Sequence, residues 1–280
     1  MKRIGIITTG IVIILVTTIY FTTRLNCHAN ISHHFYSVNH NYRLSWEDDF
    51  NGGTLDNTIW SKIKRVPWPW GCHMSDADEL YDIRRGRLRL YCKVNDGIVT
   101  NDTSPYLTGG ISSQNLKTIK YGKVEVRARI HGAQGTWPAI WMKPNDPRMQ
   151  QYPYRAEIDI VELMNHDIDC NQTVHTNYTY VLKQKENPRH TIKARIKPER
   201  YNIYCVEILP EAVIFSVNGK RTLVYPKIET SLEGQYPFGV ESFLMIDMQI
   251  GGTYRARHIN PRELPAYIDI DWVRAYDLAD

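Results

Sequence analysis

The interpretation of this chain rests on the segment Ala156-Glu157-Ile158-Asp159-Ile160-Val161-Glu162-Leu163, which places three carboxylates within six residues. Acids alternate with apolar β-formers, as is typical of a strand with one buried face. Glu157 and Asp159 share a face, whereas Glu162 would point to the opposite face of a regular strand. One extra residue, a β-bulge, would return Glu162 to their side. Because crowded like charges destabilise a strand, the cluster favours a chemical function.

Three interpretations fit such a cluster. The first is a solvated strand face. The second is a divalent metal site, although carboxylate metal sites usually recruit loop oxygens or histidines as well. The third is glycoside hydrolysis, which needs two carboxylates flanking a sugar bond. Other segments of the chain favour the third interpretation.

Length and charge limit the classes of protein to consider. The 280 residues suffice for one large domain or two small ones. The formal net charge of +4 is spread along the chain without a long basic run, so a nucleic-acid partner is not expected. With 18 Tyr and 7 Trp against 6 Phe, the aromatic residues suit a surface that both stacks and hydrogen-bonds. We expect a monomer.

The N-terminus predicts export. Met1-Lys2-Arg3 precedes an apolar run over residues 4–21, which is long for a signal peptide and just long enough for a membrane anchor. A lipoprotein signal would also end at a cysteine such as Cys27, although its usual leucine lies three residues before the cysteine and here lies two before it. We expect residues 1–30 to be an export signal or a membrane or lipid anchor. The protein would then be periplasmic, anchored at the cell surface or secreted.

Five cysteines are spread along the chain in spacings that match no zinc or redox motif. Export would permit a disulfide, but the sequence does not say which pair would form it. Buried free thiols are the alternative. The five are Cys27, Cys72, Cys92, Cys170 and Cys205.

Period-two alternation dominates the rest of the chain, and long helical patterns, linkers and repeats are absent after residue 30. Asn218-Gly219 between two alternating runs is typical of a hairpin turn. We therefore expect an all-β fold in residues 31–280, a two-sheet β-sandwich that bends to leave one concave sheet as a groove. The clearest predicted strands are 87–92, 123–130, 157–162, 213–217, 221–224 and 268–276.

Tryptophans precede the acidic segment in Gly135-Thr136-Trp137-Pro138-Ala139-Ile140-Trp141-Met142. Trp137 and Trp141 are four residues apart and would share one face of a straight strand. Tryptophan faces stack on sugar rings, and a core role is the alternative. We expect Trp137 to bind sugar and Trp141 to lie in the groove wall or the core.

Together these segments resemble family 16 of the glycoside hydrolases, in its laminarinase-like branch. The resemblance implies a curved jelly roll of the concanavalin A-like type whose concave sheet carries the acids. It implies that Glu157 is the nucleophile, Glu162 the general acid/base and Asp159 the assisting acid, and that catalysis needs no cofactor. The matching segments are 46–52, 121–127, 135–142, 157–162, 173–175, 213–220, 251–252 and 271–276.

The implied chemistry is retaining hydrolysis through a glycosyl-enzyme intermediate. Glu162 must then be protonated near neutral pH, and the like charges of Asp159 and Glu157 would raise its pKa. His175 resembles a family histidine near the acid/base, with a satisfied structural histidine as the alternative. A carbohydrate-binding module without activity would gain nothing from three crowded carboxylates, whereas a transglycosylase would share them.

Sugar-binding residues follow from loops and from departures from the family pattern. In Pro67-Trp68-Pro69-Trp70, proline-rich surface sequence exposes tryptophans where the family often places groove aromatics, and Trp70 is the stronger candidate. Arg65 and His73 stand in the same loop and are candidates to reach sugar hydroxyls.

Two further candidates, Asp247 and Gln249, occupy positions where the laminarinase pattern usually has asparagine and a small apolar residue. The loop 73–78 also lacks the usual Asn-x-Glu-x-Gln run. These departures resemble a gut-bacterial subgroup that cuts β-galactosides in mucin-type and poly-N-acetyllactosamine chains. A β-1,3- or mixed-linkage glucan is the alternative substrate.

Many family members carry a structural calcium on the convex face. The resemblance places Asp271 and Glu47 as its side-chain ligands, with a salt bridge as the alternative. Such an ion would stabilise the fold without taking part in catalysis.

Overall fold

The computed structural model describes residues 40–279, and residues Asn41–Asp280 form one compact unit. The predicted export segment over residues 1–30, including Cys27, lies outside the described residues. Across the described range, no helix combines the length and apolar character needed to span a membrane.

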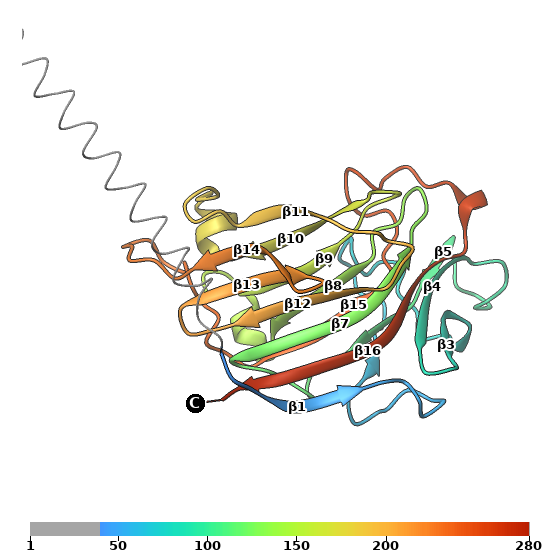
Figure 1. The fold of residues 1–280 in the computed structure, drawn as a ribbon. Coiled ribbons are helices and arrows are strands. Elements are labelled where there is room, and N and C mark those ends of the chain that lie inside the picture. Colours follow the sequence, from blue (N-terminus) through green and yellow to red (C-terminus); the bar gives the residue numbers. More distant parts are fainter. Residues whose placement is uncertain (1–39, 280) are drawn as a thin grey trace, which may run out of the picture. The chain divides into compact units, whose positions relative to one another are not determined.

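Sheet A is an antiparallel sheet of nine strands in the order β14-β13-β12-β7-β16-β4-β3, with β1 paired to β16 and β5 paired to β4. Its long strands β7 and β16 bend across the molecule (Figure 1). The strands are β1 Tyr42–Asp48, β3 Tyr81–Ile83, β4 Leu88–Val94, β5 Tyr106–Thr108, β7 Gly122–His131, β12 Asn202–Ile208, β13 Ala212–Val217, β14 Lys220–Pro226 and β16 Ala266–Leu278.

Sheet B packs against sheet A and contains seven antiparallel strands in the order β11-β10-β9-β8-β15-β6-β2. The acidic segment forms β9, which lies inside the sheet between β8 and β10. The strands are β2 Ser61–Lys62, β6 Gly110–Ser112, β8 Ala139–Pro144, β9 Glu157–Glu162, β10 Asp169–His175, β11 Thr191–Arg195 and β15 Ser242–Asp247. Short helices in the connections are η1 Asp78–Leu80, η2 Pro147–Gln150, η3 Asn177–Val181 and η4 Pro261–Glu263.

One hydrophobic core fills the space between the sheets. Strand β7 alternates strictly between buried and partly exposed residues, so Val124 and Val126 enter the core while Lys123 and Glu125 face outward. Each apolar side chain removed from water in this way stabilises the fold by about 1.5–3 kcal/mol. The predicted two-sheet sandwich is confirmed.

The predicted hairpin joins β13 and β14. Asn218 and Gly219 have φ angles of 51° and 76°, the left-handed conformation that a two-residue turn of this kind requires. Val217 and Lys220 pair across the turn, so the dipeptide fixes the register of the two strands.

The outer face of sheet A contains a buried carboxylate. Asp269 on β16 is 0% exposed because arginines from β4 and β7 cover it. Arg89 donates from Nε and Nη2 to its two oxygens at 2.5 and 2.9 Å, and Arg129 Nε donates at 2.9 Å. Arg87 adds a third guanidinium, with Nε 3.8 Å from Oδ1. This cluster ties three neighbouring strands together.

The cysteines in the described residues are free thiols rather than a disulfide pair. Cys92, Cys170 and Cys205 are buried and Cys72 is partly exposed. Of the two alternatives left open by the sequence, free thiols describe these four residues.

Candidate active site

Strand β9 has one apolar face and one acidic face. Ile158 and Ile160 enter the core, whereas Glu157 and Asp159 turn away from it. Against β8, Asp159 pairs with Trp141 and Glu162 pairs with Ala139. An advance of three residues along β9 therefore matches an advance of only two residues along β8. The same shift occurs against β10. The predicted β-bulge is confirmed, and it returns Glu162 to the face of the other two acids.

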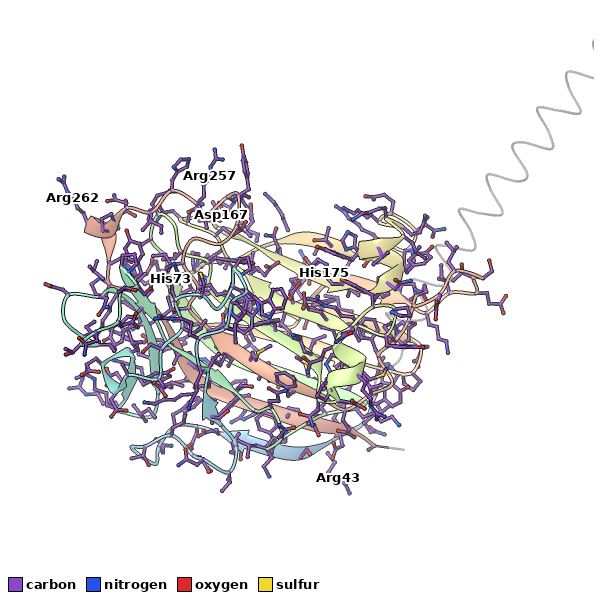
Figure 2. All side chains as sticks on the ribbon, turned by 180° about the vertical axis from the view of Figure 1, so that it is seen from behind. Arg43, His73, Asp167, His175, Arg257 and Arg262 are labelled. Atoms are coloured by element: carbon purple, nitrogen blue, oxygen red, sulfur yellow. The ribbon has the colours of Figure 1, made fainter. Side chains whose placement is uncertain are left out.

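A cavity of about 310 Å³ lies over this face, and all three acids line it. The structure also brings five of the predicted binding residues to its wall: Trp70, Trp137, Trp141, His175 and Gln249. Figure 2 looks at the molecule from behind and shows His175 among the side chains of this face. The acidic face of β9 and the predicted aromatics therefore form one concave site.

His175 pairs with the middle acid. It lies opposite Glu157 on β10, and its Nε2 is 3.2 Å from Asp159 Oδ2. Burial alone would lower the pKa of His175, but the hydrogen bond and the negative charge of Asp159 raise it to about 9. The imidazole is therefore protonated at neutral pH and forms an ion pair with Asp159.

The protonation of His175 also decides whether these residues can bind a metal ion. One ligand atom from each of Glu157, Asp159 and His175 lies within 4.8 Å of the others, which is compact enough for a metal ion. A protonated imidazole has no lone pair to offer, however, and its positive charge repels a cation. These residues do not fit a divalent metal site at neutral pH.

Glu162 has the pKa that a general acid needs. Burial and then the negative charge of Asp159 raise the pKa of Glu162 to about 8. Trp137 opposes this rise, because its Nε1 donates to Glu162 Oε1 at 2.9 Å and stabilises the ionised form. Glu162 is therefore mostly protonated at neutral pH, beside carboxylates that share its face.

Glu157 is held by a cation that the sequence analysis did not identify. Arg155 Nη2 donates to Glu157 Oε2, and Glu157 is 8% exposed. Lys143, on β8, lines the same end of the cavity. Both cations could have been found by alternation, because Arg155 stands two residues before Glu157 and Lys143 two residues after Trp141.

A buried polar network supports the floor of the site. Trp141 Nε1 donates to Asp247 Oδ2 at 2.7 Å, and Gln249 Nε2 donates to Asp247 Oδ1 at 2.7 Å. Burial raises the pKa of Asp247 to about 7. Asp247 is 0% exposed and positions Trp141 and Gln249, whereas Gln249 itself reaches the cavity. Of the two candidate sugar-binding residues Asp247 and Gln249, only Gln249 therefore lines the cavity.

The loop that carries Trp70 packs over the cavity. Trp70 meets Trp141 edge-on, with ring centroids 5.0 Å apart. Gly252 lies under this loop with a φ of 72°, and a Cβ built there would stand 2.5 Å from the carbonyl oxygen of Pro69. Glycine therefore permits the close approach that brings Trp70 to the site.

The opposite wall is made by two tyrosines that the sequence analysis missed. Tyr152 and Tyr180 stack with centroids 5.4 Å apart, and Tyr180 meets His175 edge-on at 5.8 Å. They come from a loop and from the short helix η3, 28 residues apart in sequence. No local pattern marks either residue.

Besides Asp247, two loop residues that were predicted to contact the sugar do not line the cavity. Arg65 donates through both terminal nitrogens to the Asp102 carboxylate, at 2.9 and 2.7 Å. His73 Nδ1 lies 2.7 Å from Ser104 Oγ, away from His175 in Figure 2. Arg65 and His73 therefore hold their loop against its neighbours, and neither lines the site.

The predicted calcium ligands are paired with arginines. Arg127 donates to Asp271, and Arg274 Nε lies 3.2 Å from Glu47 Oε2. Because guanidinium groups already compensate both carboxylates, these residues do not fit a bound cation. The salt-bridge alternative describes them, and the calcium site stays a prediction without structural support.

Comparison with known families identifies the family of this chain. A family model described as glycosyl hydrolases family 16 matches residues 81–274, more than half of the chain. The chain belongs to this family. The resemblance drawn from the acidic segment and the surrounding motifs is confirmed.

Curated relatives in family 16 include two kinds of glycosidase. Keratan-sulfate endo-1,4-beta-galactosidase of Sphingobacterium multivorum is 30% identical over 85% of this chain and 56% of that protein. Glucan endo-1,3-beta-glucosidase A1 of Niallia circulans is 24% identical over 83% of this chain and 37% of that protein. The chain thus spans little more than half of the first relative and about a third of the second.

Solved structures of family 16 share the architecture. One is described as belonging to endo-acting O-glycanases that members of the human gut microbiota express to initiate mucin breakdown. It is 25% identical, with a TM-score of 0.71 over 85% of this chain and 100% of that chain. The laminarinase from Rhodothermus marinus superposes with a TM-score of 0.75 at 24% identity, over 86% of this chain and 99% of that chain.

Proposed function

We propose that this chain is a retaining endo-β-glycosidase that hydrolyses internal bonds of an extracellular glycan. The observation that carries the proposal is the bulge in β9, which gathers Glu157, Asp159 and Glu162 on one face beside a cavity. The Glu162 pKa, raised to about 8, supplies a protonated acid at neutral pH. A protonated carboxyl facing an ionised one is the pair that glycoside hydrolysis uses.

In the proposed mechanism, Glu162 gives its proton to the glycosidic oxygen as the Glu157 carboxylate attacks the anomeric carbon. The bond to the leaving sugar breaks, and a glycosyl-enzyme ester forms. Glu162, now ionised, takes a proton from water, and the water oxygen displaces Glu157 from the sugar. Asp159, with His175 as its counterion, holds negative charge beside Glu162 and so favours its protonated form.

For the substrate, we propose internal β-galactosides of mucin-type or poly-N-acetyllactosamine chains. The sequence identity of 30% to a keratan-sulfate endo-β-galactosidase and of 25% to a mucin O-glycanase supports this class. Asp247 and Gln249, where the laminarinase pattern usually has other residues, also support it, because their hydrogen-bond network forms the floor of the cavity. An exported, monomeric protein would suit a polymer found outside the cell.

A β-1,3(4)-glucan is the second candidate, because several relatives and solved structures carry glucanase names. A sugar-binding protein without activity is a third class, since a beta-1,3-glucan-binding protein of Penaeus monodon is 32% identical over 43% of this chain. The intact acidic face of β9 argues against the third class.

A product profile distinguishes these candidates. The protein is incubated with laminarin, lichenan, keratan and mucin O-glycans, and the released oligosaccharides are sized. We expect oligosaccharides from keratan or mucin glycans, with the first-formed product retaining the β-configuration by NMR. Release from laminarin or lichenan alone would overturn the galactoside proposal, and release of monosaccharides alone would contradict an endo-acting enzyme.

Substitution of the acids tests the mechanism directly. Glu157→Gln removes the nucleophile and Glu162→Gln removes the proton donor, so each should lower kcat by about 10²- to 10⁴-fold or more. Glu229→Gln, at an exposed position outside the cavity, is the matched control and should keep wild-type turnover. Near-normal turnover in either acid variant would exclude its assigned role.

A further inference from the structure

The cavity that holds the acids continues past Trp70 into a second hollow of about 450 Å³. Pro69, Trp70, Lys143 and Arg155 line both spaces, so the two form one continuous surface. We call the second hollow the groove extension. A glycan bound beside Glu157 is therefore positioned to reach it.

The groove extension is positively charged. Its only ionisable lining residues within 40–279 are Lys143 and Arg155, and its other polar side chains are Gln150 and Gln151. Arg155 is balanced by its bond to Glu157. The net charge that remains at this surface is therefore that of Lys143.

Lys143 is a half-buried ammonium that no carboxylate of residues 40–279 contacts within 4 Å. Among residues 40–279 it forms no hydrogen bond or ion pair, and its Nζ lies 5.7 Å from the centroid of the Trp141 ring. Burial lowers its pKa, although Glu157 partly opposes the effect. Removing a charge from water is costly unless it is paired. Such a cation suits a site whose counterion arrives with the ligand.

Aromatic surface lies beside this cation. Trp68 is 63% exposed and lines the groove extension together with Trp70. A large exposed indole offers a stacking face for a sugar ring, and a nearby ammonium offers a contact for an anionic oxygen. The two features together point to a sugar that carries a negative substituent.

We propose that the groove extension is a subsite for a sugar bearing an anionic substituent, a sulfate ester or a carboxylate, with Lys143 as its charge contact. Trp68 and Trp70 stack on the sugar ring, and Lys143 donates to the anionic oxygens. This inference rests on the proposed galactoside activity and narrows its substrate class to anionic chains.

The test compares four substrates: keratan sulfate, chemically desulfated keratan, sialylated poly-N-acetyllactosamine and neutral poly-N-acetyllactosamine. Wild type should show a higher kcat/KM on at least one anionic chain than on its neutral counterpart. The measured quantity is the ratio of kcat/KM on an anionic chain to kcat/KM on its neutral counterpart. Lys143→Met should lower this ratio about tenfold or more, as expected for loss of a hydrogen bond to a charged group. Lys143→Arg should restore most of the ratio, and added salt should weaken the preference in the wild type.

Lys220→Met is the matched control, because Lys220 is exposed on β14 and lies away from both hollows. It should leave the ratio unchanged. Loss of preference for sulfated chains alone identifies a sulfate subsite, and loss for sialylated chains alone identifies a carboxylate subsite. If Lys143 acts only on Glu157, anionic and neutral substrates lose rate equally, and the constant ratio overturns the subsite.

Failure of the subsite is distinct from failure of the proposed function. Wild type that cleaves keratan chains without preferring an anionic form overturns the subsite and leaves the galactosidase proposal intact. Wild type that cleaves only glucans overturns both. The melting temperature of each variant shows whether a lost ratio has a folding cause.

Discussion

At the scale of the single residue, the protonation of Glu162 is a balance between its neighbours. Burial and the Asp159 charge raise its pKa to about 8, while the Trp137 indole stabilises the ionised form. A general acid works only while protonated, so kcat/KM should fall as pH rises through about 8. The alkaline limb of the pH profile thus reports on this one carboxyl and its coupled partners.

Trp137→Phe removes the hydrogen bond and keeps an aromatic ring. Because that bond favours the charged carboxylate, its loss should raise the Glu162 pKa further and move the alkaline limb to higher pH. The measurement is the pH dependence of kcat/KM for the variant and the wild type. A limb that stays in place or moves to lower pH would show that Trp137 does not tune Glu162.

Alternation predicted the position of the acids correctly, and the same rule would have found Arg155 and Lys143. The bond between Arg65 and Asp102 could not be predicted from the sequence, because the two residues are 37 positions apart and only the folded chain shows that they meet. Tyr152 and Tyr180 were missed for the same reason, since stacking between a loop and a short helix leaves no periodic signal.

At the scale of the element, β9 could be predicted in detail, including its bulge, because three acids have no stable place in a core. The hairpin at Asn218-Gly219 was equally readable, since its turn chemistry is local. The end of strand β15 was harder to predict from the sequence. It ends at Asp247, and the buried bond between Asp247 and Gln249 could not be anticipated from spacing alone.

The Trp70 loop offers a test at this scale. Gly252→Ala adds a Cβ only 2.5 Å from the Pro69 carbonyl and strains a residue with positive φ. We expect a loss of unfolding free energy of about 1–3 kcal/mol and a raised KM, since Trp70 must shift. Denaturant titration and steady-state kinetics measure the two effects.

Gly97→Ala is the matched control, because Gly97 has a φ of 73° with nothing near its missing Cβ. It carries the backbone strain without the collision, so its KM should stay at the wild-type value. Equal KM values for the two variants would mean that the close approach at Gly252 does not position the loop.

At the scale of the whole molecule, the buried ion cluster around Asp269 and the acids of β9 lie on opposite sides of the core. Asp269 lies on the outer face of sheet A among three arginines, with the core between it and the acids of sheet B. Asp269→Asn leaves these guanidinium groups without their shared counterion, which should cost about 3–5 kcal/mol of unfolding free energy. At a temperature where the variant stays folded, kcat should match the wild type.

The same variant has a pH signature. Burial would raise the pKa of Asp269, but its bonds to Arg89 and Arg129 outweigh burial and lower it. A carboxyl with a depressed folded pKa stabilises the protein above its unfolded pKa of about 3.9 and loses that contribution as pH falls through the folded value. The stability difference between wild type and Asp269→Asn should therefore shrink below about pH 4 in denaturant titrations. A difference that is constant down to strongly acidic pH would contradict this role.

The interior position of β9 has a consequence for how such a protein can diversify. The three acids stand on a strand bonded on both sides, between β8 and β10. The walls around them come from loops instead: Trp68 and Trp70 from the connection between β2 and η1, and Tyr152 from the connection between η2 and β9. Sequence changes in these loops can therefore alter which sugars bind, while the acids on β9 keep their arrangement.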